Sequence, residues 1–283
     1  MYKFPIGVML ESFHTSIPEA LKLAVQAGAA GIQVYATDGE LAPQNLSVIK
    51  RREFLREVQT HGLRVCAVCG DFGKGFGDAA LNPELIEKSK RVLDLAEDWD
   101  CDIVTTHIGV VPADNASARY GVMQAACAEL AAYADSIGAH FAVETGPETA
   151  VTLKSFLDGL HSRGVAVNMD PANFVMVTGD DPVRAVYTLR DYIVHTHAKD
   201  GVRLRESDPL AVYGELERTM DEGRDFQETP LGEGGVDFPR YLAALEEVGY
   251  RGFLTIEREV KNGADVQQAA DYLRGLINGL RPA

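Results

Sequence analysis

Residues 140–170, HFAVETGPETAVTLKSFLDGLHSRGVAVNMD, contain the repeating unit of this chain and decide its fold. The apolar run at 140–144 is short and is typical of a buried strand. An amphipathic stretch follows over 150–162, and Gly164 is placed to end a helix before a second apolar run over 165–170. A strand, a helix and a second strand in this order predict a βαβ unit with parallel strands.

The same pattern extends in both directions from this unit. Short apolar runs alternate with amphipathic stretches of about 12 to 20 residues, which is the alternation expected of βα units. The strand candidates are residues 6–10, 31–35, 64–68, 102–107, 140–144, 165–170, 192–197 and 252–257. The helix candidates are residues 17–27, 46–60, 83–99, 117–136, 150–162, 181–189, 238–248 and 265–280. Units of this number and length predict an α/β fold, a single (β/α)₈ barrel domain over residues 1–283.

One connection, from Ala198 to Asp237, is much longer than the others. It follows the seventh strand candidate, and long loops in compact domains are usually functional. Because it leaves the carboxyl end of a strand, we expect it to lie over the catalytic mouth. The rival architecture, a doubly wound open sheet, requires a glycine-rich phosphate turn after an early strand, and none follows Leu10 or Tyr35.

Composition excludes several kinds of partner. The chain of 283 residues has 27 Lys and Arg against 42 Asp and Glu, a formal charge of −15. This charge opposes binding to a phosphate backbone, so we expect no nucleic-acid partner. No apolar stretch approaches the roughly 20 residues of a membrane span, so we expect no membrane partner. Four cysteines in apolar or helical surroundings and the absence of a signal-peptide pattern predict a cytoplasmic protein.

Four successive strand candidates end at side chains that can bind a metal. They are the fifth to the eighth, and they end at Glu144, Asp170, His197 and Glu257. In a parallel barrel the carboxyl ends of the strands meet at one mouth. Three carboxylates and an imidazole around one point are the ligands of a hard or borderline divalent cation such as Mn²⁺, Mg²⁺, Co²⁺ or Zn²⁺. Any one of the four could be structural, but four at equivalent positions favour a metal-dependent enzyme.

Other polar side chains are expected near the same mouth, where they could bind substrate. A solvated loop is an equally good interpretation for the two that follow the first strand, and a salt bridge is the alternative for the lysine. These residues are Glu11, His14, His107, Lys199 and Arg258.

Several segments carry a resemblance to a known family. The chain resembles the xylose isomerase-like TIM barrel superfamily of sugar phosphate isomerases and epimerases over nearly its whole length. That superfamily includes ketose 3-epimerases, hydroxypyruvate isomerase, inosose isomerase and dehydratase, and the AP endonucleases. The segments are VETGPET (143–149), NMDPANF (168–174), VHTHAKD (194–200), PLGEGGVDF (230–238) and GYRGFLTIERE (249–259).

The resemblance implies a metal-dependent isomerase or epimerase of a small sugar, keto-polyol or hydroxy-ketone. In the family a Glu, Asp, His, Glu quartet binds one divalent metal, most often Mn²⁺ in our expectation, and it aligns with the four strand ends above. The chemistry passes through a metal-stabilised enediolate, and the resemblance implies Glu144 and Glu257 as the acid/base pair as well as ligands. His195 shares the face of His197 and is expected to support it.

Departures from the family limit what can be transferred. Asn173 stands where the AP endonucleases, and commonly the ketose 3-epimerases, have a histidine, and we expect it at the substrate. The third strand ends in Cys69-Gly70-Asp71, without the histidine of a three-metal site. Together with the acidic charge, these departures argue against the nuclease branch and leave the sugar specificity open.

Two other functions remain compatible with the sequence. The same metal and base could remove a proton next to the ketone and expel a β-hydroxyl, as a dehydratase does. A barrel that only binds a sugar would bind its ligand without turnover. By analogy with relatives, a homodimer or homotetramer is expected.

Overall fold

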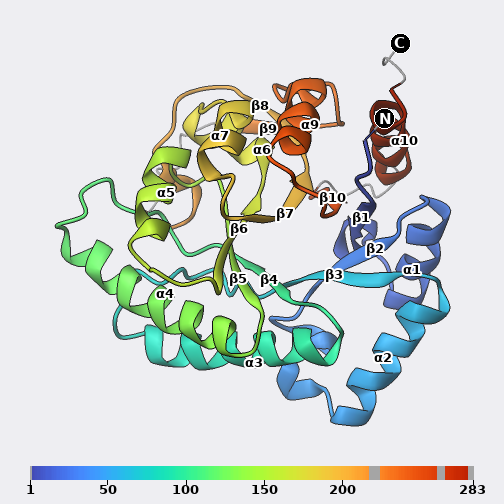
Figure 1. Ribbon diagram of the computed structural model, residues 1–283, viewed down its shortest axis with the longest axis horizontal. Helices are drawn as coiled ribbons and strands as arrows, with labels where there is room; N and C mark the ends of the chain where they lie inside the picture. The colour runs from blue at the N-terminus through green and yellow to red at the C-terminus, as the bar shows by residue number, and fades with distance from the viewer. Residues whose placement is uncertain (1, 217–223, 260–264, 280–283) are drawn as a thin grey trace.

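Eight parallel strands close into a barrel with the order β1, β10, β7, β6, β5, β4, β3, β2 around its circumference (Figure 1). The computed structural model describes residues 2–216, 224–259 and 265–279. This is the predicted single (β/α)₈ barrel. Its strands are β1 (Ile6–Met9), β2 (Gly31–Tyr35), β3 (Arg64–Cys69), β4 (Ile103–Thr106), β5 (His140–Glu144), β6 (Val165–Met169), β7 (Ile193–Ala198) and β10 (Leu254–Ile256).

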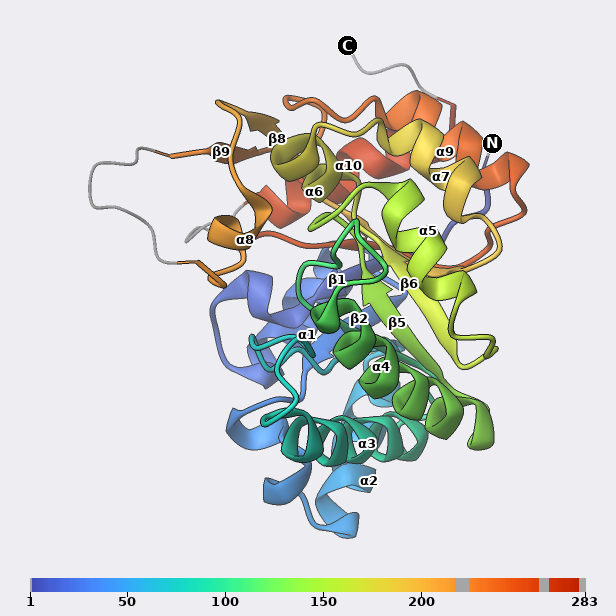
Figure 2. The same cartoon turned by 90° about the vertical axis from the view of Figure 1, so that its left-hand side faces the viewer.

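Helices surround the barrel on its outside (Figure 2). The longer ones are α1 (Ile17–Gln26), α2 (Val48–Thr60), α3 (Asn82–Asp98), α4 (Ala118–Ser136), α5 (Ala150–Asp158), α7 (Pro182–Leu189), α9 (Phe238–Glu247) and α10 (Val266–Ile277). Short turns complete the connections: the 3₁₀ turns η1 (Leu10–Phe13), η2 (Gly39–Leu41) and η3 (Pro43–Asn45), the single turn α6 (Pro171–Asn173) and the π-helical turn η4 (Phe174–Thr178).

Local sequence explains where several of these helices begin. The side chain before the helix accepts a hydrogen bond from a backbone N–H of the first turn, which would otherwise lack a partner. The residues that do this are Ser47 for α2, Ser117 for α4, Thr149 for α5, Asp181 for α7 and Asp237 for α9.

The predicted strands and helices are present, with ends that differ by a few residues. The helix expected over 150–162 ends at Asp158, because Gly159 caps it and His161 turns into the left-handed region at a φ of 50°. The helix expected to reach residue 280 is described as far as Ile277, and residue 280 lies outside the described residues.

The long connection after β7 has structure of its own. It contains the strands β8 (Asp200–Arg203) and β9 (Phe226–Thr229), which pair antiparallel, and the single turn α8 (Pro209–Val212). The prediction of a loop missed these elements because both strands are short and polar. Residues 217–223 of this connection lie outside the described residues.

The register of the strands brings four of their carboxyl ends together. Around the barrel, β5 pairs with β6, β6 with β7 and β7 with β10. Glu144 is opposite Asn168, Asn168 is opposite His195, and His197 is opposite Thr255. The residues that follow these pairs therefore reach one edge of the barrel from neighbouring strands.

The interior of the barrel beneath that edge is polar. The Gln33 side chain on β2 donates to Thr105 Oγ1 on β4 at 3.1 Å, and its Oε1 lies 3.0 and 3.1 Å from Nε2 of His195 and His197 on β7. Gln33, Thr105 and His197 are completely buried. Since buried polar groups are stable only when hydrogen bonded, this network fixes the side chains below the mouth.

Asp200, the first residue of β8, binds the segment that follows β9. Its buried carboxylate accepts the backbone N–H groups of Gly201, Gly232, Gly234 and Val236 at 2.9 to 3.0 Å. A Cβ atom at Gly234 would lie 2.2 Å from Asp200 Oδ1, so only glycine allows this approach.

Glu148, in the loop after β5, ties that loop to the one after β4. Its Oε2 accepts the Val111 N–H at 3.1 Å, while its buried Oε1 has no hydrogen-bond partner within the described part of the chain. Burial raises the pKa of Glu148 to about 8, against the lowering effect of the Val111 N–H, and the nearby Glu215 carboxylate adds to the rise.

We expect Asp200→Ala to free the segment at residues 232–236, because four amide donors lose their acceptor. Unsatisfied buried donors cost roughly 1–3 kcal/mol, so amide hydrogen exchange of Gly232, Gly234 and Val236 should accelerate at least about tenfold. Asp200→Asn keeps one acceptor oxygen and should give an intermediate rate. Unchanged exchange in Asp200→Ala would show that Asp200 does not hold the segment.

The stability of the folded chain should depend on pH through Glu148. The Glu148 carboxyl ionises more readily in the unfolded chain than in the folded one, so the stability from its protonated form should be complete below about pH 4.5 and be lost as pH rises towards about 8. Glu148→Gln keeps a neutral side chain that can accept the Val111 N–H. Urea unfolding between pH 5 and pH 9 should therefore show a smaller decline for the variant, and parallel declines would contradict the assignment.

Candidate metal centre

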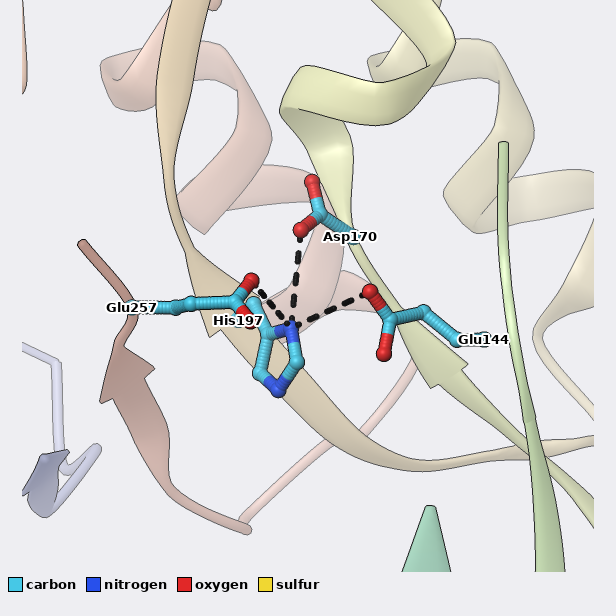
Figure 3. A group of neighbouring side chains, drawn as sticks. All are labelled: Glu144, Asp170, His197 and Glu257. Atoms are coloured by element: carbon cyan, nitrogen blue, oxygen red, sulfur yellow. Dashed lines mark ion pairs between the residues drawn. The ribbon is translucent and has the colours of Figure 1, made fainter. Parts of the chain in front are cut away.

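Glu144, Asp170, His197 and Glu257 meet at the mouth of the barrel (Figure 3). His197 Nδ1 lies 3.1 Å from a Glu257 oxygen, 3.5 Å from Asp170 Oδ2 and 3.6 Å from Glu144 Oε1. The four ligand atoms all lie within 4.8 Å of one another, and all four residues are buried. The structure thus brings together the quartet expected from the strand ends.

Hydrogen bonds hold two of the carboxylates in place. Asp170 Oδ1 accepts the Asn173 N–H at 3.0 Å and begins the turn α6, which leaves Oδ2 to face His197. Glu144 accepts the Asn168 amide on Oε2 at 3.1 Å and the Asn173 amide on Oε1 at 3.2 Å. Each carboxylate is therefore oriented by a neighbouring amide.

Gln33 determines how the His197 ring is oriented. Because the Gln33 amide nitrogen donates to Thr105, its oxygen faces the ring and accepts the His197 Nε2–H at 3.1 Å. In the neutral ring, this hydrogen bond leaves the lone pair of Nδ1 directed at the carboxylates. Metal-binding histidines commonly donate their second ring N–H to such a partner.

The charges of the quartet are strongly coupled. Burial alone would lower the pKa of His197, but Glu257 and Glu144 outweigh it and hold that pKa well above its usual range. Burial would raise the pKa of Glu257, but Lys199 and His197 hold it well below its usual range. Burial raises the pKa of Asp170. Three buried carboxylates around one point require positive charge, which a cation at the centre would supply.

The side chains present fit a divalent cation. Asp170 Oδ2 and His197 Nδ1 are buried and have no hydrogen-bond partner among the residues that the structure describes. A buried polar atom without a hydrogen bond is costly, so two of them that face one point fit a bound cation. Glu144, Asp170, His197 and Glu257 would hold the ion, through three oxygens and one nitrogen.

A cavity of about 200 Å³, here called the inner cavity, opens beside the quartet. Its charged side chains are mainly acidic, and apolar side chains close part of its circumference. It is lined by Met9, Tyr35, Cys69, Asp71, His107, Glu144, Asn173, Met176, Val177, Lys199, Val212, Tyr213, Phe226, Glu257 and Glu259.

Three of the predicted substrate-binding residues line the inner cavity. His107 Nε2 lies 3.5 Å from Glu144 Oε1, and its buried Nδ1 has no hydrogen-bond partner in the described ranges. Lys199 Nζ lies between Glu257 at 3.2 Å and Glu259 at 3.3 Å. Asn173 packs closely on the loop after β5. A Cβ atom at Gly146, whose φ is +128°, would lie 2.2 Å from the Cβ of Asn173.

Four other predicted residues lie away from the lining. His195 is buried beneath the site against Gln33, and burial lowers its pKa well below the usual range. Glu11 accepts the Tyr35 N–H at 3.0 Å, and His14 occupies a left-handed turn at a φ of 50°. Arg258 is buried, and its guanidinium pairs with Glu228 and Asp265.

Several residues that complete the site were not predicted from the sequence. Gln33 and Asn168 interrupt apolar runs, GIQVY and VAVNM, and a polar residue within a buried strand is the signal that could have identified them. Glu259 follows Glu257 by two residues, so the alternation of side chains could have placed it on the same side. Tyr213 reaches the inner cavity from a segment whose path the sequence does not define, and no comparable signal marks it.

A larger hollow of about 670 Å³ lies outside the barrel between α3 and α4. Small and apolar residues form most of its lining, and its two carboxylates, Glu87 and Glu129, are exposed. It has none of the buried ionisable groups of the mouth, so we place the functional site at the mouth. Among the described residues, every helix is too short or too polar to span a membrane.

Comparison with known proteins agrees with the fold and extends it to a family. One curated relative is the rhizopine catabolism protein MocC of Rhizobium meliloti, 37% identical over 90 residues, which are 29% of this chain and 24% of that protein. The match therefore spans about a quarter of that relative's length.

Solved structures match over almost the whole chain. A xylose isomerase domain protein from Planctomyces limnophilus is 26% identical with a TM-score of 0.80, covering 99% of this chain and 98% of that one. The 3-keto-D-glucoside 4-epimerase YcjR from E. coli shares the fold at 15% identity and a TM-score of 0.72, over 98% and 100% of the two chains. The probable 3-DHS dehydratase AsbF from Bacillus anthracis shares it at 18% and 0.72, over 96% and 99%.

A sequence model of one family matches residues 21–276, which include all four residues of the quartet. With the barrel topology and the solved structures, this match identifies the chain as a member of the xylose isomerase-like TIM barrel family.

Proposed function

We propose that this chain is a divalent-metal-dependent isomerase or epimerase of a small sugar, keto-polyol or hydroxy-ketone. The observation that carries the proposal is the arrangement of Glu144, Asp170 and Glu257 around Nδ1 of His197, beside a cavity. The fold that the chain shares with a 3-keto-D-glucoside 4-epimerase supports a sugar ketone as substrate.

The metal supplies one part of the chemistry. When bound, a divalent ion would act as a Lewis acid on a ketone and its neighbouring hydroxyl, acidifying the adjacent C–H. The oxygen-rich ligand set favours Mn²⁺ or Mg²⁺, with Co²⁺ and Zn²⁺ as alternatives.

The two glutamates supply the proton transfer. Glu144 and Glu257 approach His197 from opposite sides in Figure 3, so each faces a different side of a substrate bound between them. Lys199 and His197 hold the pKa of Glu257 well below its usual range, so this carboxylate is ionised, which is the form that a base requires. A base on each face is what epimerisation requires, whereas isomerisation moves the proton along one face.

We further propose that His107, Lys199 and Asn173 contact substrate hydroxyl or carbonyl groups. All three line the inner cavity and carry donors directed at the quartet. The four cysteines are buried and form no disulfide, which supports a reducing, cytoplasmic compartment; they are Cys66, Cys69, Cys101 and Cys127.

A second candidate function is dehydration of a keto-polyol. It is favoured by the fold shared with a protein named as a probable 3-DHS dehydratase. The same base would remove the proton, and a β-hydroxyl would then leave as water. Product analysis separates the two, because isomerisation conserves mass whereas dehydration loses water and creates an enone absorbance.

Calorimetric titration of Mn²⁺ into chelator-stripped protein should show one ion per chain. Asp170→Asn should weaken binding at least about 100-fold, since a charged ligand is lost while the cap of α6 is retained. Asp180→Asn is the matched control, because Asp180 pairs with Arg184 outside the quartet, and it should bind like the parent. A parent that binds no divalent ion would leave a sugar-binding barrel without catalysis as the better interpretation.

Glu257→Gln should lower the rate of metal-dependent exchange of the α proton with D₂O, measured by NMR on ketoses at saturating Mn²⁺. We expect a loss of about 10²-fold or more, because a positioned base contributes about 10²–10⁴. Glu247→Gln, on the exposed surface of α9, should leave exchange unchanged. Equal rates in Glu257→Gln and the parent on every accepted ketose would refute the acid/base role.

A further inference from the structure

A second cavity lies beside the inner cavity at the mouth of the barrel. It has a volume of about 420 Å³ and is here called the outer cavity. Asp71, His107 and Tyr213 line both cavities, so the two share a wall. The loops after β3 and β4 form much of the outer cavity, and residues 213–215 of the long connection close one side.

Glycines allow the loops around the outer cavity to pack closely on one another. A Cβ at Gly75 would lie 2.7 Å from the backbone N of Gly109, and a Cβ at Gly109 would lie 2.7 Å from Glu215 Oε1. Gly75 and Gly109 both have positive φ, at 59° and 86°. Five glycines, at positions 73, 75, 77, 109 and 214, form part of the lining.

The wall between the two cavities is held by specific contacts. Glu215 Oε1 accepts the Val110 N–H at 2.9 Å, and its other oxygen pairs with Arg119. The rings of Tyr213 and His107 pack edge to face, with their centroids 5.1 Å apart. These contacts fix residues 213–215 against the loop after β4, so both cavities keep their shape.

The lining of the outer cavity suits a neutral molecule with many hydroxyls. Asp71, Asp78 and Glu215 offer acceptors, whereas Lys74 and Arg119 offer donors. Arg119 is already neutralised by Glu215, and the carboxylates outnumber the cations, so a phosphate or carboxylate would be repelled. Mixed donors and acceptors around backbone groups match the hydroxyls of a sugar ring.

The volumes of the two cavities indicate how much of a substrate each one could hold. Ligand pockets commonly measure about 300–1,000 Å³; the inner cavity, at about 200 Å³, falls below that range and the two cavities together fall within it. The inner cavity alone has room for one small reacting unit.

We infer that the substrate has two units: a hydroxy-ketone ring that reacts in the inner cavity and a second, uncharged glycosyl unit that binds in the outer cavity. This inference rests on the proposed function, whose site it extends. It assigns specificity to Glu215 and to the residues of the loops after β3 and β4 that line the outer cavity but not the inner one.

Leu81 offers a test that leaves the inner cavity intact. Its side chain is 44% exposed and lines the outer cavity but not the inner one, so Leu81→Trp should partly fill the outer cavity without unfolding the chain. Leu81→Ala is the matched control, because it enlarges the same space. The probes are a keto-disaccharide, 3-ketosucrose, and the corresponding keto-monosaccharide, 3-ketoglucose.

Calorimetry on Mn²⁺-loaded protein should give a Kd for the keto-disaccharide at least about tenfold below that for the keto-monosaccharide. Leu81→Trp should abolish this preference while changing the monosaccharide Kd by less than about twofold, and Leu81→Ala should retain the preference. Equal affinities in the parent, or equal weakening of both sugars by Leu81→Trp, would overturn the inference.

Exchange of the α proton with D₂O, measured on the same samples, separates the two proposals. Exchange with 3-ketoglucose but no preference for the disaccharide would overturn the assignment of a glycosyl unit to the outer cavity and leave the proposed function standing. A disaccharide preference that Leu81→Trp abolishes, without exchange in either sugar, would support the outer cavity and overturn the proposed function.

Discussion

Repulsion among three buried carboxylates is the constraint on which the mouth of this barrel depends. Glu144, Asp170 and Glu257 point at one imidazole nitrogen, where each negative charge raises the energy of the others. The closed ring of strands can hold them there because each strand is hydrogen bonded on both sides and cannot shift outward. The apolar layer between strands and helices offsets this cost, so the site is a local strain on an otherwise conventional core.

The sequence predicts the part of the site that strands carry. Alternation and strand length determine which face Glu144, Asp170, His197 and Glu257 share, and a parallel barrel gathers strand ends by its topology. Arg258 shows the limit of this reasoning. It follows Glu257 directly, but the alternation of side chains turns it to the opposite side, where Glu228 and Asp265 bind it. Glu228 lies on β9, so the pairing of Arg258 depends on where that strand packs.

The remaining features could not be predicted because they depend on how loops fold. The strands β8 and β9 are too short and polar to give a clear periodicity, and Tyr213 and Glu215 contact the loop after β4 through His107 and Val110. Contacts between residues more than 100 positions apart, such as Glu215 with Val110, leave no local signature. The division is physical: the strands position the quartet, whereas the loops form much of the walls of the two cavities.

Lys199 and Asp200 are consecutive residues that face different parts of the molecule. The ammonium of Lys199 lies against Glu257, whereas the carboxylate of Asp200 binds backbone amides of the segment that follows β9. A displacement of that segment would therefore reach Lys199 through one peptide bond and shift the ammonium that lies against Glu257. The position of the surface segment and the charge beside a buried carboxylate of the quartet are thus linked through adjacent residues.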